Sequence, residues 1–129
     1  MRHQARGMFT VKMVPLLPPP ADGLTRYSID KEIRGDLDAI TQGEMLAGGN
    51  PRQSSAAYVA METVIGTLHG RAGTFALAHM GTLDVSGQKM VILVVPGSGT
   101  DQLRGIAGTL TIVEQSGQHS YELDYTLPD

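Results

Sequence analysis

Cysteine is absent from the sequence, so disulfides, thiolate nucleophiles and zinc–thiolate sites are excluded. Aromatic residues make up only 5% of the chain, and the net charge is −3 without any basic tract. Both features argue against a nucleic-acid partner. No apolar run approaches the roughly 20 residues of a membrane helix, and the N-terminal segment lacks the uninterrupted apolar region of a signal peptide. We therefore expect a soluble cytoplasmic protein without a membrane partner.

A metal site is not expected either, because the four histidines show no paired ligand spacing. The chain is rich in residues that form turns: 16 glycines and 7 prolines separate short runs rich in Val, Ile, Thr, Leu and Met. No window sustains the 3.6-residue period of a helix, which favours an all-β chain. The expected strands span residues 7–14, 25–34, 37–46, 57–68, 74–84, 89–95, 109–115 and 120–127.

Eight antiparallel strands with mostly short turns suit an up-and-down barrel or a sandwich. We favour the single eight-stranded up-and-down barrel, because closing the sheet removes both edges and encloses a small lumen. The chain of 129 residues is then one barrel domain, with residues 1–6 as an N-terminal tail and 15–24 as a Pro-rich loop. The glycine-rich segment 97–108 is expected to form a corner, with Leu103 and Ile106 placed to plug the barrel end.

One predicted hairpin carries two ionisable residues on an otherwise apolar face. If the turn in LHGRAG (68–73) centres on Gly70 and Arg71, antiparallel pairing places Glu62 directly opposite His79. Opposed side chains have Cβ atoms about 4.5–5.5 Å apart, which brings a hydrogen bond within reach. A slip of one residue would put the two residues on opposite faces, so the prediction depends on the turn.

The predicted pair has two interpretations. Burial disfavours an ionised carboxylate and a neighbouring imidazolium favours it, so Glu62 and His79 could exchange a proton near neutral pH as catalytic residues. Alternatively, the pair is a structural ion pair that fixes the strand register. The two interpretations are compatible if the pair lines a lumen.

Four further residues are candidate ligand-binding groups. A plausible register brings Glu44 near Tyr58 or Glu62, and Arg26 could lie across from Glu44, which would give a polar patch inside the barrel. The alternative is that the alternating polar residues of the second strand face water: Arg26, Ser28, Asp30 and Glu32. On the last strand, Tyr121 lies on a face that is typical of a core, although its hydroxyl could hold a ligand oxygen.

An ordered set of motifs resembles a known family. It comprises IDKEIRGDL (29–37), GEML (43–46), YVAME (58–62), GTLHGRAGTFALAHMGTL (66–83), VVPGSGT (94–100) and HSYELDYTL (119–127). Together they resemble the bacterial domain-of-unknown-function family 3224. This resemblance implies a barrel of the allene oxide cyclase-like kind, and GSGTDQLRGIAG (97–108) is similar to the corner of dirigent proteins and allene oxide cyclases. The family pattern includes Glu44, Glu62 and His79.

The resemblance implies no cofactor, because the cyclase relatives mostly hold a flexible apolar substrate in one conformation. Our first hypothesis is a barrel that binds a small, mostly apolar ligand in its lumen, with Glu62 and His79 at the polar end. As an enzyme it would be a cofactor-free isomerase or cyclase, in which Tyr58 and Tyr121 orient the ligand and Arg26 or Glu44 sets the local potential.

The second hypothesis is a non-catalytic barrel whose interior is filled by its own side chains. Several apolar residues would then project from its outer face, which predicts a homo-oligomer, most simply a dimer: Val59, Met61, Ile65 and Met80. The free volume inside the barrel distinguishes the hypotheses, because ligand sites typically reach several hundred Å³.

Overall fold

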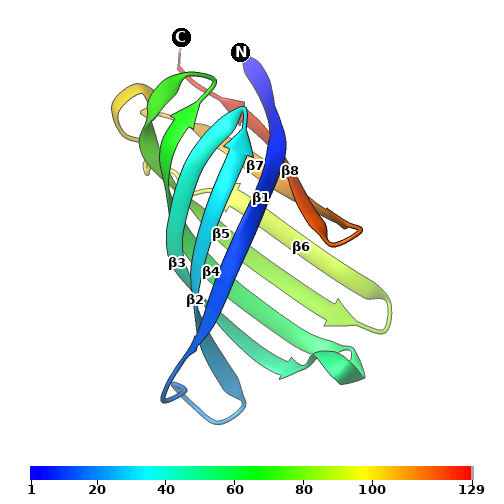
Figure 1. Cartoon of the computed structure of the whole chain (residues 1–129). Coiled ribbons are helices and arrows are strands. Elements are labelled where there is room, and N and C mark those ends of the chain that lie inside the picture. The colour runs from blue at the N-terminus through cyan, green and yellow to red at the C-terminus, as the bar shows by residue number, and fades with distance from the viewer. Residues whose placement is uncertain (129) are drawn as a thin grey trace.

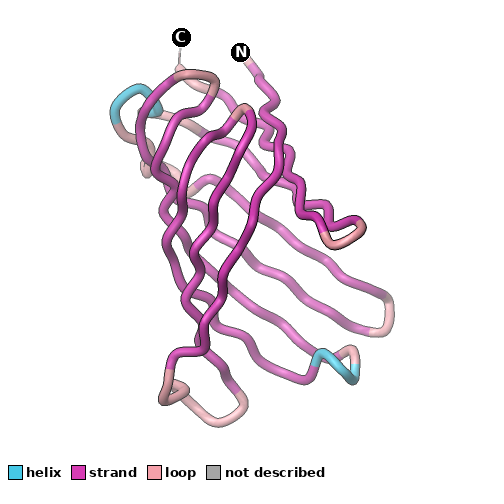
Figure 2. Tube along the Cα trace, viewed as in Figure 1, coloured by secondary structure: helices cyan, strands magenta, loops and turns pink. Residues whose placement is uncertain are grey.

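A computed structural model describes residues 1–128 and confirms the predicted eight-stranded antiparallel barrel, in which each strand pairs with the next and β8 pairs with β1 (Figure 1). The strands are β1 (Arg2–Leu16), β2 (Leu24–Gly35), β3 (Leu37–Asn50), β4 (Ser55–Leu68), β5 (Arg71–Asp84), β6 (Gly87–Val94), β7 (Ala107–Gln115) and β8 (Gln118–Thr126). Strand dominates the trace in Figure 2, which also shows the short 3₁₀ helices η1 (Pro51–Gln53) and η2 (Asp101–Leu103). Across the described chain, neither helix has the length needed to cross a membrane.

The N-terminal strand is longer than expected at both ends. Residues 1–6 were predicted to be a tail, which is wrong, because β1 begins at Arg2 and pairs with β8 from Arg2–Thr126 to Phe9–His119. At its other end β1 continues past Pro15 to Leu16, so the Pro-rich loop begins later than predicted. Pro15 has no N–H to donate, and a strand tolerates it here because this part of β1 pairs only with β2.

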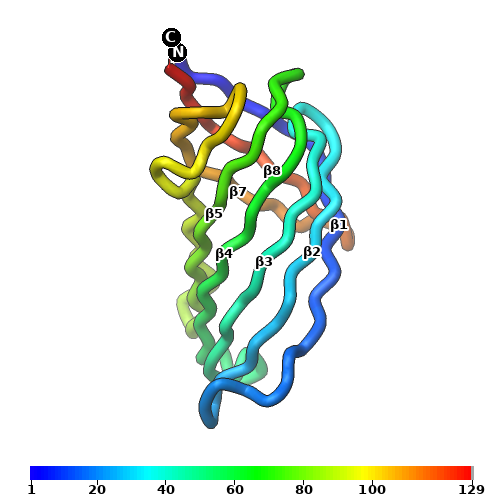
Figure 3. Tube along the Cα trace, turned by 90° about the vertical axis from the view of Figure 1, so that its left-hand side faces the viewer, coloured from blue at the N-terminus to red at the C-terminus, as the bar shows by residue number. Residues whose placement is uncertain are grey.

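One end of the barrel is plugged by the glycine-rich corner between β6 and β7. Leu103 and Ile106 are buried there among the inward side chains of the strands, as the sequence predicted. The corner is fastened along the upper part of β5: the Thr74 N–H donates to Thr100 Oγ1 at 3.0 Å, and the Thr100 N–H donates to the Thr74 carbonyl at 2.9 Å. We call this the plugged end; both chain termini lie near it (Figures 1 and 3).

Toward the opposite end of the barrel, which we call the far end, strand pairing around the barrel is incomplete. The hairpin of β7 and β8 stops part-way down the barrel, whereas β1 to β6 continue (Figure 1). Within residues 1–128, β6 is in register with β7 only at Leu93–Thr109, and the β1–β8 ladder ends at Phe9–His119. The lower parts of β1 and β6 therefore each have a strand partner on one side only, and the inner face is less enclosed there.

Candidate functional site

The hairpin of β4 and β5 has a different register from the one predicted. Its turn is centred on His69 and Gly70, whose φ angles of 47° and 80° are those of a two-residue type I′ turn. Glu62 is therefore opposite Leu77, and His79 is opposite Ala60. The predicted register was wrong by two residues. Because side chains alternate with a period of two, this shift keeps both residues on the same face.

Glu62 and His79 meet inside the barrel as diagonal neighbours. Glu62 Oε2 contacts His79 Nε2, and the two side chains are 0% and 5% exposed. The predicted acid–imidazole contact is thus confirmed as geometry, although it is made across the diagonal. Both groups are enclosed by apolar neighbours, so their interaction is weakly screened by solvent.

A third charged group, which the sequence analysis missed, completes the cluster. Lys31 on β2 places Nζ 2.9 Å from Glu62 Oε2, with a side chain only 10% exposed. To reach Glu62, it spans β3, whose inward residue opposite Glu62 is Gly43. A Cβ at position 43 would lie 2.0 Å from the Met61 carbonyl oxygen and 2.8 Å from the Glu62 Cβ. Glycine therefore lets β3 and β4 approach closely and leaves the space that Lys31 crosses.

We define the polar belt as Lys31, Thr41, Glu62 and His79, one inward residue from each of β2 to β5. Lys31 is the direct register partner of Thr41. Glu62 is two residues from the register partner of Thr41, and His79 is two residues from the register partner of Glu62. These two-residue steps follow the stagger that strands acquire when a sheet closes into a barrel. The belt crosses the middle of an inner wall that is otherwise apolar.

The belt holds Glu62 as a carboxylate. Burial alone raises the pKa of Glu62, but the bond to His79 and the charge of Lys31 outweigh it and lower the pKa from 4.5 to about 2. Tyr58, further along the same face of β4, has its pKa raised by burial and then by the negative charge of Glu62. At neutral pH Glu62 is therefore an acceptor of hydrogen bonds rather than a proton donor.

Two oxygen atoms of the polar belt lack partners. Among the described residues, neither Glu62 Oε1 nor Thr41 Oγ1 has a hydrogen-bond partner, although both atoms are buried. An unsatisfied buried polar atom costs about 1–3 kcal/mol. The belt can therefore accept a hydrogen bond from a molecule inside the barrel and gain free energy from it.

A cavity of about 200 Å³ lies toward the far end. Its inward lining is mostly apolar and includes Met45, Ala47, Tyr58, Gly81 and Leu83. The Tyr58 ring lies against Gly81, where an added Cβ would be 2.2 Å from Tyr58 Cε1. None of the four belt residues lines this cavity, but Tyr58 does, and the charge of Glu62 acts on the Tyr58 hydroxyl. The volume of the cavity is below the 300–1,000 Å³ typical of ligand pockets, so it suits a small molecule only.

Comparison with known proteins gives a family and a close structural relative. A family described as "Protein of unknown function (DUF3224)" matches residues 5–125. The chain belongs to this family. A solved DUF3224 structure from Shewanella oneidensis MR-1, of unknown function, is 37% identical, covers 100% of this chain and 99% of its own, and superposes with a TM-score of 0.91. No curated protein matches the chain.

Two predicted ligand-binding residues of this DUF3224 barrel lie outside the lumen. Arg26 Nε is 3.0 Å from Glu44 Oε1, and both side chains are substantially exposed. The predicted internal patch is therefore wrong, and the alternative, in which these residues face water, is confirmed. The reason is alternation: Ile29 and Ile33 point inward on β2, which turns the even-numbered side chains outward.

Tyr121, the other predicted ligand-binding tyrosine, acts at the plugged end. Its hydroxyl accepts a hydrogen bond from the Leu37 N–H at 3.1 Å. It also lies 3.0 Å from the carbonyl oxygen of Arg34 and 3.1 Å from that of Leu37, either of which it can donate to. These partners tie β8 to the turn between β2 and β3, so the hydroxyl is occupied structurally and lies apart from the polar belt.

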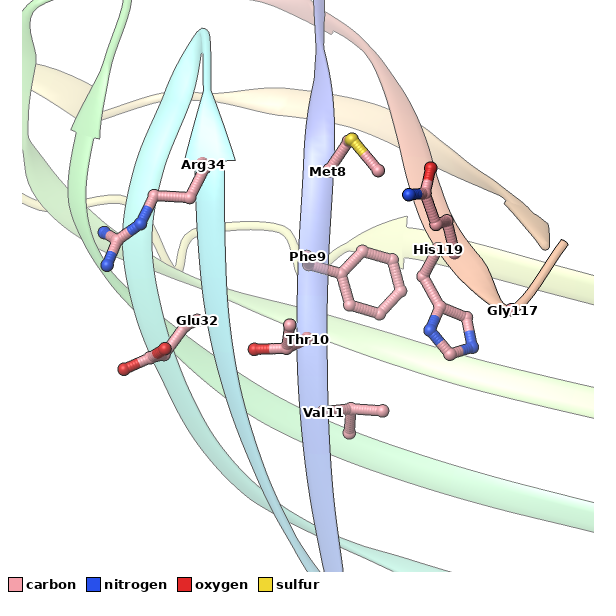
Figure 4. Close-up of a pocket in the computed structure, with 9 residues that line it drawn as sticks. Met8, Phe9, Thr10, Val11, Glu32, Arg34, Gly117 and His119 are labelled. Carbon is pink, nitrogen blue, oxygen red and sulfur yellow. The ribbon is translucent and has the colours of Figure 1, made fainter. Parts of the chain in front are cut away.

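The other histidines also have local partners. At the plugged end, His69 Nδ1 is 2.5 Å from the Tyr125 hydroxyl, which joins the turn between β4 and β5 to β8. Near the end of the β1–β8 ladder, His119 stacks on Phe9 beside a groove of about 460 Å³, and Figure 4 shows the two rings side by side. Lys31 Nζ lies 5.0 Å from the centre of the same Phe9 ring.

Within the described chain, no three His, Asp or Glu residues converge as metal ligands.

Proposed function

We propose that this DUF3224 protein binds a small, mostly apolar molecule in the far-end cavity, with the polar end of the ligand directed at the polar belt. The observation that carries the proposal is the pair of buried, unpartnered oxygens, Glu62 Oε1 and Thr41 Oγ1, on an otherwise apolar inner wall. A wall that only filled space would gain stability from apolar residues at these positions. The cavity of about 200 Å³ beside Tyr58 supports this placement.

The charges of the belt indicate the chemistry of the ligand's polar end. Lys31 and Glu62 compensate each other, so the belt does not require an ionic ligand. Glu62 is ionised, and its free oxygen can only accept a hydrogen bond. A ligand carboxylate would instead meet the Glu62 carboxylate with like charge. The expected ligand is therefore a neutral molecule with an O–H or N–H donor.

The cavity also limits the size of the ligand. At the ~30 Å³ that one water occupies in the liquid, 200 Å³ corresponds to about seven non-hydrogen groups. Small aromatic or branched alcohols and amides are of this size. Tyr58 would then cover the apolar part of the ligand, since its ring lines the cavity and lies against Gly81.

A second candidate function is cofactor-free isomerisation or cyclisation of such a molecule. The contact between Glu62 and His79 favours it, because a buried carboxylate holds the imidazole ring in one orientation. Glu62 would be the orienting carboxylate and His79 the group that transfers the proton, since a pKa of about 2 keeps Glu62 ionised and unable to donate. The resemblance to allene oxide cyclases supports this candidate only by analogy, because one fold hosts many activities.

Ligand-observed NMR with three matched probes tests the binding proposal: benzyl alcohol, toluene and benzoate. We expect benzyl alcohol to bind more tightly than toluene and benzoate to bind most weakly. Glu62→Gln should reduce the preference for the alcohol over toluene, whereas Glu44→Gln, which alters an outer-face carboxylate, should not. Thr41→Val provides a second interior variant of nearly the same shape if Glu62→Gln does not fold.

The outcomes separate the parts of the proposal. If none of the probes binds the wild-type protein at millimolar concentration, the proposed binding function is wrong. If benzoate binds best, the ligand class is wrong while the cavity remains. Equal retention of the alcohol by wild type and both interior variants would remove the belt from the site.

A further inference from the structure

The outer surface of the barrel is divided into a charged side and a neutral side. Ion pairs cover β8, β1 and β2 and reach onto β3: Arg2–Asp124, Arg6–Glu122, Arg26–Glu44 and Arg34–Asp38. The outward side chains of β4 and β5 differ sharply, because none is charged from residue 57 to residue 82. Within that range Glu62 and His79 point inward, and the exposed Arg71 is the first residue of β5, at the plugged end.

The neutral side is also strongly apolar. On β4 and β5, Met80, Met61 and Val59 are 56%, 55% and 50% exposed. Exposed apolar side chains on the flanking strands extend the surface, and we call the whole set the β4–β5 face: Ile40, Leu46, Val59, Met61, Ile65, Met80, Val91 and Leu93. An apolar surface of this extent is unusual on a monomer and marks an interaction site.

The β4–β5 face has both protruding side chains and a groove, so two copies of it can fit together. Met61 is paired with Ala78, so a long side chain stands beside a short one. Around them is a groove of about 430 Å³, lined by Leu46, Val59, Met61 and Ala78 and bordered by the Arg26–Glu44 ion pair. Methionine is flexible and polarizable, so it adapts well to an irregular apolar groove.

We propose that a second copy of this chain covers the β4–β5 face in a two-fold symmetric homodimer. In such a dimer the same patch meets itself, and its centre does so without like-charge repulsion, because the outward side chains of β4 and β5 are uncharged from residue 57 to residue 82. The protruding Met61 and Met80 side chains of each protomer enter the groove of the other. A membrane surface is a poorer occupant, because the outward side chains of β4 and β5 include no cation, Arg26 at the border is paired with Glu44, and the net charge is −3.

The size of the face agrees with what a stable dimer needs. β4 and β5 each have 14 residues, which gives a length of about 46 Å at the usual rise of a strand. The four strands β3 to β6 span about 14 Å across. Because β6 has only 8 residues, about 26 Å, the flat area is about 570 Å² per protomer, and side-chain relief increases it toward the ~800 Å² that each partner buries in a standard interface.

Sedimentation velocity over a dilution series from millimolar to micromolar protein tests the proposal. We expect the wild-type protein at twice the chain mass of 13.7 kDa. The double variant Met61→Lys/Met80→Lys should sediment as a monomer. Val113→Lys is the matched control, because Val113 is 53% exposed on β7, outside the β4–β5 face, and this variant should remain dimeric.

Cysteine crosslinking provides a second readout that does not depend on the double variant folding. The chain has no cysteine, so a single Met61→Cys substitution introduces a unique thiol. Under oxidising conditions it should give a covalent dimer, whereas Val113→Cys should not. A monomeric wild type at millimolar concentration, an assembly of three or more chains, or equal crosslinking at both positions would overturn the proposal.

Discussion

Removal of the Glu62 carboxylate should change how the stability of the barrel depends on pH. The folded protein holds the pKa of Glu62 at about 2, compared with the ordinary value of 4.5 expected for the unfolded chain. A carboxyl group whose pKa is lowered by folding stabilises the folded state above the unfolded pKa, and this contribution is lost as pH falls through the folded pKa. The shift of about 2.5 pH units corresponds to about 3 kcal/mol.

The pH window follows from the same two values. Above pH 5 the full contribution of about 3 kcal/mol should be present, and at pH 3 only about 1.4 kcal/mol should remain. A protonated Glu62 resembles glutamine in shape and charge. The free energies of unfolding of the wild type and of Glu62→Gln should therefore differ by about 3 kcal/mol at pH 7 and converge near pH 2.

Urea unfolding followed by circular dichroism, at pH values from 7 to 2, measures this convergence. Glu44→Gln is the control, because it removes an exposed carboxylate and should run parallel to the wild type. If Glu62→Gln instead stays a constant distance below the wild type throughout, the carboxylate is not held ionised by Lys31 and His79. The electrostatic account of the belt would then be refuted.

Three further predictions concern packing and the separation of structural from binding roles. Gly43→Ala should lower the melting temperature by several degrees or prevent folding, and thermal unfolding compares it with Gly48→Ala on the same strand. Gly48→Ala should be mild, since its new Cβ would lie 3.1 Å from the flexible Leu24 side chain and at an ordinary 3.6 Å from the Gly23 carbonyl oxygen. Tyr121→Phe should destabilise the fold by about 1–3 kcal/mol in urea without changing benzyl alcohol binding, and binding lost without lost stability would contradict its structural role. A variant with apolar residues in place of all three ionisable members of the polar belt should be at least as stable as the wild type in urea unfolding. The same variant should no longer prefer benzyl alcohol to toluene.

The architecture of this protein could be predicted because its local signals agree. Turn residues and short runs rich in β-branched side chains repeat along the chain, and closure of eight such strands follows from the need to satisfy strand edges. The register of the β4–β5 hairpin was harder to predict, because it depends on which two turn residues adopt positive φ angles. His69 and Gly70 do so rather than Gly70 and Arg71, and that single difference moved every partner in the hairpin by two.

The candidate site could be predicted only in part. Glu62 and His79 stood out as polar residues on apolar faces. The register error was an even number of residues, so both side chains still lie on the same face of the sheet. Lys31 gave the same signal, since it stands between Ile29 and Ile33, but the charged residues beside it obscured the alternation. Its reach across β3 could not be read from the sequence, because it depends on Gly43 being the register partner of Glu62.

Burying the charged groups of the polar belt costs free energy of folding, and this cost bears on the role of the belt. Replacing a buried ion pair with apolar residues is often neutral or stabilising, so Lys31 and Glu62 are not explained by stability. Register alone does not require them either, because the type I′ turn and the corner contacts with β5 already fix the strands that carry Glu62 and His79. The free oxygen of the buried Glu62 carboxylate and the small apolar cavity lined by Tyr58 are instead the two features on which the proposed recognition of a neutral hydrogen-bond donor rests.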